Sequence, residues 1–203
     1  MITEDELVKL SIDFSNSWAI WPEAGESDEK FFIFVLGELH INSIFLGYMH
    51  SNEELKSPFI NFHNKSYTGD NRIKGFFSSI DLSNLKGSLM TNLHDQEVNK
   101  NLDPQISVIY LKRKIKFYPS KIRKIICFGD DTFDDLCKGL EIDSKMHKKE
   151  VGKKNLRFVS KKMNNEETWK IFRVYKHNSY GAHQQLGDVE LPAQLKYIND
   201  LVF

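Results

Sequence analysis

The chain is poor in the features that mark export, membrane insertion or a polyanionic partner. Its two cysteines, Cys127 and Cys137, have a spacing typical of neither a zinc site nor a redox pair, so we expect two buried free thiols. No apolar run approaches the ~20 residues that cross a bilayer, and no signal peptide is recognisable. The 28 basic and 28 acidic side chains cancel, so net charge gives no argument for nucleic acid or membrane. We therefore expect a cytoplasmic protein without membrane contact.

Familiar catalytic signatures are absent as well. The sequence has no Gly-x-Ser-x-Gly elbow for a nucleophilic serine, no glycine-rich loop that would cradle a phosphate, and no His-Glu-x-x-His helix for zinc. Serine hydrolases, P-loop nucleotidases and zinc peptidases are therefore not predicted. We expect neither a metal site nor a cofactor.

The charges are unevenly distributed along this neutral chain. Residues 112–124 contain seven Lys or Arg and no acid, and residues 145–162 contain eight Lys or Arg and one Glu. Such runs can follow a phosphate backbone, but a solvated helix face and a solvated loop are the more usual explanation.

The best-defined signal for secondary structure lies at residues 121–137. Ile122 to Phe128 is a short, β-branched and nearly all-apolar run, as expected for a strand that is buried on both faces. Gly129 ends this strand, and Asp130 follows at a position where an aspartate suits both a helix cap and the helix dipole. A strand, a glycine turn and a capped helix form half of a βαβ unit.

The whole chain alternates between predicted strands and helices. Strands are predicted at 41–48, 87–93, 122–128 and 169–175, with helices at 71–82, 103–118, 130–140 and 191–202. Residues 155–160 also alternate like a strand, whereas 143–154 is basic and turn-like. This order predicts an α/β fold, namely one three-layer α/β/α domain with a mainly parallel central sheet of about four strands. That domain would span residues 1–203, with a helical and aromatic segment at 1–40 before the core at 41–203.

Polar side chains gather where the predicted strands end, and the ends of parallel strands share the edge at which α/β sheets bind ligands. An Asn in such a place donates and accepts at once, which suits the edge of a base or an amide, although Asn92 would also suit a turn. A His can donate to a developing oxyanion. Phe62, in the long polar segment 49–70, could stack on a planar ligand or pin its loop to the core.

Several short motifs occur in a recognisable order. They are Gly47 after a strand, Asn61-Phe62-His63, Asp70, Gly87-Ser88-Leu89-Met90-Thr91-Asn92, Ile125-Ile126-Cys127-Phe128-Gly129 and His177-Asn178-Ser179. Together they resemble the uracil-DNA glycosylase-like superfamily over roughly residues 41–185, and especially a bacterial branch with an Asn-Phe-His element and a Gly-x-x-Met-Thr-[Asp/Asn] strand. The resemblance implies that superfamily's fold and a metal-independent hydrolysis of the N-glycosidic bond of a flipped base in DNA.

The resemblance also implies roles for single residues. Asn92 matches the Asn that reads the base edge, and Phe62 is the better candidate for the ring that stacks on the base. His177 and Ser179 match the His-x-Ser motif that stabilises the anionic oxygen of the leaving base. Gly47 would line the base pocket. The implied partner is DNA, or a nucleobase or another small planar ligand.

Two positions depart from the superfamily's pattern. Met49, which would also line the pocket, stands where an Asp or Asn should position the attacking water, and Asn178 replaces the Pro of the motif. Candidates to position the water instead are His50, Ser51, Asn52 and Asp70. Besides the enzyme, the sequence therefore leaves open a base- or nucleotide-binding module without chemistry, and an interaction protein with a vestigial pocket.

Overall fold

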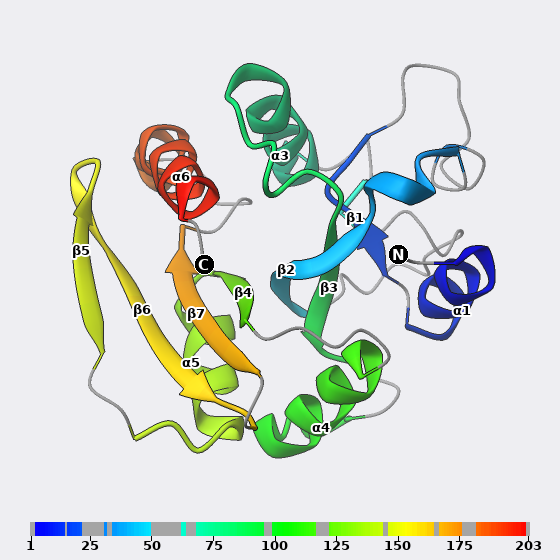
Figure 1. Ribbon diagram of the computed structural model, residues 1–203. Coiled ribbons are helices and arrows are strands. Elements are labelled where there is room, and N and C mark those ends of the chain that lie inside the picture. Colours follow the sequence, from blue (N-terminus) through cyan, green and yellow to red (C-terminus); the bar gives the residue numbers. More distant parts are fainter. Residues whose placement is uncertain are drawn as a thin grey trace.

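The computed structural model places one mixed β-sheet between helices (Figure 1). It describes residues 3–14, 16–21, 31, 34–49, 62–63, 68–95, 99–116, 122–143, 146–164, 167–175 and 182–201. The helices are α1 (Glu4–Phe14), the 3-10 helix η1 (Leu36–Glu38), α3 (Thr68–Ser79), α4 (Pro104–Ile115), α5 (Asp130–Gly139) and α6 (Ala182–Asp200). The strands are β1 (Ser17–Trp18), β2 (His40–Met49), β3 (Ser88–His94), β4 (Ile122–Phe128), β5 (His147–Val151), β6 (Lys154–Lys162) and β7 (Thr168–Val174).

The seven strands lie in the order β1-β3-β2-β4-β7-β6-β5. β3, β2, β4 and β7 run parallel to one another, and these are the four strands that the sequence predicts. β1 is antiparallel to β3, and the β5–β6 hairpin adds two antiparallel strands beside β7. The α/β class is therefore confirmed.

The prediction of about four strands is wrong, because three antiparallel strands extend the sheet at its edges. β1 has two residues, which is too short for an alternating pattern to be seen. β5 is exposed almost along its whole length and carries basic side chains, a composition that resembles a turn. Edge strands need less apolar surface than central strands, so their sequences carry a weaker signal.

Helices cover both faces of the sheet. Ile73 of α3 and the apolar side of α6 pack with Phe45 of β2 on one face. Leu111 of α4 and Leu136 of α5 pack with Leu46 on the other face, because neighbouring residues of a strand point to opposite sides. In Figure 1, α3 and α6 lie at the top of the view and α4 lies at the bottom. The result is a helix–sheet–helix arrangement.

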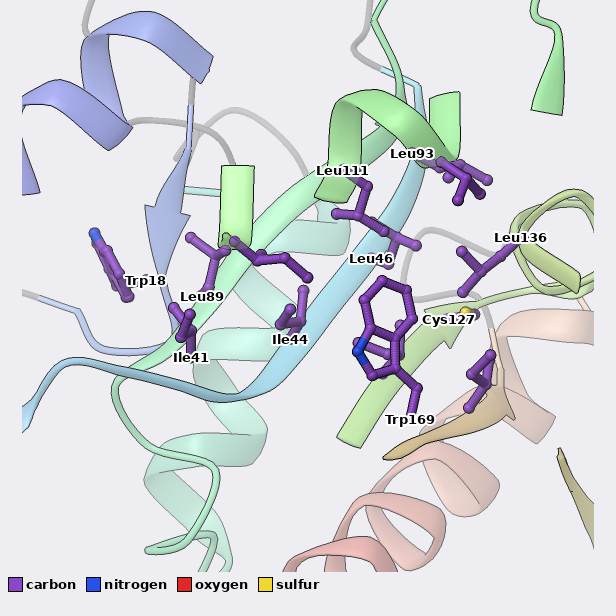
Figure 2. Packing of buried hydrophobic residues seen from close by; sticks show 14 of the residues in the cluster. Trp18, Ile41, Ile44, Leu46, Leu89, Leu93, Leu111, Cys127, Leu136 and Trp169 are labelled. Carbon is purple, nitrogen blue, oxygen red and sulfur yellow. The ribbon is translucent and has the colours of Figure 1, made fainter. Parts of the chain in front are cut away.

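The core on the face of α4 and α5 contains two tryptophans that are almost completely buried. Trp18 belongs to the short strand β1, and Trp169 belongs to β7. Figure 2 shows Trp169 beside Cys127 and Leu46, beneath side chains of the covering helices. The indole N–H of Trp169 donates to Glu167 at 2.8 Å, so this large side chain is buried without an unsatisfied donor.

Both cysteines are free, as the sequence predicts. Cys127 is buried in β4, and Cys137 is half-buried in α5. Burial raises the pKa of Cys137 to about 12 and that of Cys127 well above its ordinary value. Because the thiolate is the reactive form, both side chains serve packing rather than chemistry.

One predicted helix end agrees with the structure, and two differ from it. Asp103 caps α4, with its carboxylate accepting from the backbone N–H of Gln105 at 2.7 Å. At α5 the N-cap is Gly129, with a φ of 91°, and the side chain of Asp130 binds arginines instead of capping. α6 begins at Ala182 rather than at 191 and includes Pro192 in its interior. Among the described helices, none is both long and apolar enough to span a membrane.

The basic run 112–124 is not a uniformly solvated face. Lys114, Arg123 and Lys124 are buried, and each has partners inside the fold. Arg123 pairs with Glu167 and donates to the carbonyl of Ile41. Lys124 donates to the carbonyls of residues 198 and 201 at 3.0 and 2.8 Å and thus closes the C-terminal end of α6. These cations join helices to the sheet.

Lys114 is the most deeply buried lysine among the described residues. Its ammonium group donates to the Thr91 hydroxyl at 2.9 Å and lies 4.9 Å from the centre of the Tyr110 ring. Burial lowers the pKa of Lys114 to about 8, although the charge of Asp95 opposes this change. The folded protein therefore loses this proton at a lower pH than the unfolded chain.

Replacing Lys114 should remove a pH dependence of stability. Between about pH 8 and 10.5 the unfolded chain holds the lysine proton and the folded protein does not, so the free energy of unfolding should rise by about 3 kcal/mol with pH. The rise should be missing in Lys114→Met and retained in Lys112→Met, which changes an exposed residue of the same helix. Urea unfolding across this pH range measures it, and equal slopes for all three proteins would contradict the assignment.

Candidate functional site

The carboxyl ends of β2 and β4 lie where the direction of the connections reverses. From β2 the chain crosses to β3 on one side, and from β4 it crosses to β7 on the other. In open α/β sheets, ligands bind outside the strand ends at such a switch point. Gly47 and Met49 lie at the end of β2, and Phe128 lies at the end of β4. The predicted strand-end site therefore falls at the switch point.

Three of the predicted base-binding residues meet here. Gly47 is the register partner of Asn92 on the neighbouring parallel strand. A Cβ atom on Gly47 would lie 2.3 Å from Oδ1 of Asn92 and 2.8 Å from Cζ of Phe62. The amide and the aromatic ring thus both rest on the Gly47 backbone, and they are only 4% and 6% exposed. No residue other than glycine permits this close approach.

Phe62 reaches this position through a strained backbone. Its φ is 66°, in the left-handed region that an aromatic residue rarely adopts. Such strain costs roughly 1–3 kcal/mol and persists only where the surroundings impose it. His63 supplies the constraint, because its Nε2–H donates to the Trp18 carbonyl at 2.9 Å and its ring stacks on Trp21 at 4.9 Å between centroids. In the sequence, His63 is recognisable only as part of the Asn-Phe-His element.

His63 holds the backbone in place and does not act as a general acid. Burial lowers the pKa of His63 to about 4, although its bond to the Trp18 carbonyl acts in the opposite direction. The imidazole is therefore neutral near pH 7. In this form it holds one proton on Nε2, which the Trp18 carbonyl accepts.

An aromatic floor lies below the three converging residues. The Phe62 ring is 6.2 Å from that of Phe128, which stacks on Phe45 at 5.7 Å. Phe77 of α3 completes the floor, edge-on to Phe45 at 5.8 Å. These rings form an aromatic cluster beside the contact of Gly47, Phe62 and Asn92, and polar groups placed next to apolar rings are typical of small-molecule recognition.

A buried polar cluster fixes the ends of β2 and β3. Met49 is half-buried and pairs in register with His94, which is fully buried. His94 Nδ1 lies 2.8 Å from the Ser107 hydroxyl, and its Nε2 lies 2.9 Å from Asp135. A carboxylate only accepts, so Nε2 carries a hydrogen that faces Asp135, and Asn99 also donates to the Ser107 hydroxyl at 2.8 Å. Both ring nitrogens of His94 are therefore occupied.

Tyr48 extends this cluster to the surface of the site. Its ring meets His94 edge-on, 4.7 Å away. Burial raises the pKa of Tyr48, and the negative charge of Asp135 raises it further, so the phenol stays protonated. The polar end of β3 is visible in the sequence, but Ser107 and Asp135 are not. They lie 13 and 41 positions from His94, and no local pattern links residues at those separations.

Of the predicted site residues not yet placed, the structure describes Asp70 alone. Asp70 lies in the first turn of α3 and is half-buried. His50, His177 and Ser179 lie outside the described residues. Across the described ranges, no group of three or more His, Cys, Asp or Glu side chains could hold a metal ion.

No family model matches the chain, and no curated protein matches it. The function is therefore inferred from the geometry at the switch point. Its central feature is the contact of Asn92 and Phe62 above the Gly47 backbone.

Adding one methyl group at this contact should destabilise the protein. In Gly47→Ala the new Cβ would overlap Asn92 and Phe62, so we expect a loss of about 1–3 kcal/mol in the free energy of unfolding. Gly75→Ala is the matched control, because its Cβ would meet nothing within 4 Å and alanine favours a helix by about 0.5–1 kcal/mol. Urea unfolding compares the two, and a Gly47→Ala variant as stable as the control would show that the contact is loose.

The burial of the neutral His63 ring predicts that the stability of the protein falls in acid. Between about pH 6.5 and 4 the unfolded chain takes up the His63 proton and the folded protein does not, so stability should fall by about 3 kcal/mol as the pH is lowered through this range. His63→Gln retains a donor for the Trp18 carbonyl and does not titrate, so this variant should lose less. Thermal melts at pH 4, 5 and 6.5 compare it with the exposed control His147→Gln. A parallel decline in both variants would refute the role.

Proposed function

We propose that this chain is a uracil-DNA glycosylase-like protein that holds an extruded base above Gly47 and hydrolyses its N-glycosidic bond without a metal. The observation that carries the proposal is the meeting of Gly47, Phe62 and Asn92 at the switch point of the sheet. These residues belong to separate motifs of the resemblance, and Phe62 and Asn92 lie thirty positions apart in the sequence.

Each residue has a physical task in this proposal. The Asn92 amide offers one acceptor and two donor hydrogens, which complement the alternating groups on the Watson–Crick edge of a pyrimidine. Phe62 stacks on the base, and Gly47 allows the Phe62 ring and the Asn92 amide to lie against the backbone of β2. The apolar floor strengthens the amide's hydrogen bonds, because few water molecules compete for them.

The chemical step needs a stabilised leaving group and a positioned water. Uracil leaves as an anion, so a donor at its oxygen binds more strongly as the charge develops. His177 and Ser179 take this role in the proposal. His50, Ser51, Asn52 and Asp70 are the candidates to position the water. Nothing in this scheme requires a cofactor.

Met49 favours a second function, the binding of a base without hydrolysis. Met49 lies at the end of β2 as the register partner of His94, at the place where the resemblance expects a carboxylate or amide. A thioether is a weak acceptor and takes no proton from water at neutral pH. In this alternative the pocket retains recognition and lacks the step that cleaves the bond.

The first function predicts abasic sites that depend on Asn92. The purified chain should convert a single-stranded, uracil-containing oligonucleotide into fragments after alkali treatment, and Asn92→Ala should reduce this activity about 10- to 100-fold, because the base loses its bidentate partner. Phe62→Ala should reduce the ratio of the protein's affinity for the uracil strand to its affinity for a thymine strand. Asn101→Ala, which changes an exposed asparagine, is the matched control.

The outcomes separate the two functions. Uracil-dependent binding without cleavage, together with a gain of cleavage in Met49→Asp, would establish the binding module. Equal affinity for uracil and thymine strands in the parent and in Asn92→Ala would refute both functions.

A further inference from the structure

Three cations lie in one row across the outer strands of the sheet. The register places Lys148 of β5 opposite Arg157 of β6, and Arg157 opposite Arg173 of β7. We call these three residues the cationic row. Like charges directly opposite each other destabilise a sheet, so this row costs folding energy unless an anion offsets it. The row lies near the carboxyl end of β7, on the same edge of the sheet as the candidate site.

One carboxylate orients both arginines. Arg173 binds Asp130 with two parallel bonds, from Nε at 3.0 Å and from Nη2 at 2.6 Å, and Arg157 binds the same carboxylate through its Nη2. The Arg173 guanidinium also lies over the Tyr175 ring at 5.3 Å. The two forks are thus held in fixed directions before any ligand arrives, which lowers the entropic cost of binding.

The cationic row borders an open cavity of about 410 Å³. Lys154, Asn155 and Tyr175 complete its lining, so the cavity offers four cations, an amide and a phenol against the single carboxylate of Asp130. Burial lowers the pKa of Arg157, and the charge of Arg173 lowers it further. Asp134 of α5 offsets part of the charge on Arg173. An additional anion would relieve the remaining repulsion between the two guanidiniums.

A solvated edge strand does not account for these arginines. Edge strands often carry lysines that keep other chains away, and the exposed Lys149 and Lys162 of the same hairpin suit that role. The side chains of Arg157 and Arg173 are only 28% and 19% exposed, and each ends in the planar, forked guanidinium of an arginine. Such a fork matches the geometry of a phosphate rather than that of bulk water.

The hairpin that carries the row is fixed to the rest of the fold. The buried carboxylate of Glu190 in α6 accepts from the backbone N–H groups of Lys153 and Lys154 at 2.9 and 3.1 Å. Asp130 follows Phe128 by two residues, and the Phe128 ring contacts Phe62. The end of β4 therefore connects the Phe62–Phe128 contact with the carboxylate of the cationic row.

We propose that the cationic row binds a phosphate group, with Arg157 and Arg173 donating through the guanidinium N–H groups that do not bind Asp130, and that this phosphate belongs to the nucleic-acid strand whose base is held at Gly47, Phe62 and Asn92. The second clause rests on the proposed function, whereas the phosphate site itself does not. A free phosphate or nucleotide offers the same chemistry as the strand. Phosphate contacts fix the position of a strand without reading its sequence, which leaves base recognition to Asn92.

The test uses a single-stranded oligonucleotide made entirely of abasic tetrahydrofuran units, which has phosphates and no bases. Its affinity for the full chain is measured by fluorescence anisotropy from 20 to 200 mM salt. Arg157→Gln/Arg173→Gln should bind about tenfold more weakly, with a salt slope shallower by about 0.7 for each lost contact. Lys149→Gln/Lys162→Gln removes the same charge from the other face of the hairpin and should retain the parent's slope.

A second variant separates binding from structural damage. Asp130→Asn breaks the same ion pairs as the arginine substitutions but removes the competing anion, so it should bind the abasic strand more tightly than the parent. If Asp130→Asn and the arginine variant weaken binding equally, or if the lysine control weakens it as much as the arginine variant, the phosphate site is refuted.

Two further arms identify the source of the phosphate and separate the proposals. Inorganic phosphate and deoxyuridine monophosphate are titrated at constant ionic strength. If they bind in an arginine-dependent manner while the abasic strand does not, the site serves free phosphates and the link to a strand is overturned. The gain in affinity from one uracil in the abasic strand reports the base pocket alone. If the uracil adds no affinity while the arginine substitutions still weaken binding of the abasic strand, the proposed function is refuted and the phosphate site is retained.

Discussion

The register of β2 against β3 is the constraint on which the candidate site depends. β2 is hydrogen-bonded to β3 on one side and to β4 on the other, so both of its edges are satisfied within the sheet. This register sets Gly47 opposite Asn92 and Met49 opposite His94. Because side chains alternate along a strand, a slip of one residue would move Phe45 out of one core and Leu46 out of the other. The apolar packing on both faces therefore fixes the register that places Gly47 beside Asn92 at the strand ends.

Buried ionic and polar groups connect the elements around this sheet. Lys124 joins β4 to the end of α6, Arg123 joins β4 to the segment before β7, and Glu190 joins α6 to the β5–β6 hairpin. Each of these groups is desolvated, and each recovers part of that cost through hydrogen bonds to backbone or to a counter-charge. Their positions fix the orientation of helices that apolar packing alone would allow to slide.

The sequence predicts the centre of the fold better than its edges. β4 is recognisable because burial on both faces demands an apolar run such as Ile125 to Phe128, and β7 is recognisable because its apolar and polar residues alternate. Gly47 and Asn92 are found by their places at strand ends, and Phe62 is singled out by its motif. Asp135 is missed, because its bond to His94 spans 41 residues and leaves no local pattern. β5 is missed because exposed basic residues in an edge strand resemble a loop, and the burial of Lys114, Arg123 and Lys124 depends on tertiary partners.

The β5–β6 hairpin also has a consequence for how the chain folds. β4 and β7 are parallel neighbours, and every residue pair between them is separated by 46 positions, from Ile122 with Thr168 to Phe128 with Val174. Closing such a loop costs entropy before any contact rewards it, and parallel pairing over long separations is intrinsically slow. α5 and the hairpin occupy most of this interval and are stabilised by local bonds, so once they form the free chain left to close is short. The outer strands therefore favour the pairing of β7 with β4, because the hairpin and α5 shorten the free chain between these two strands before they meet.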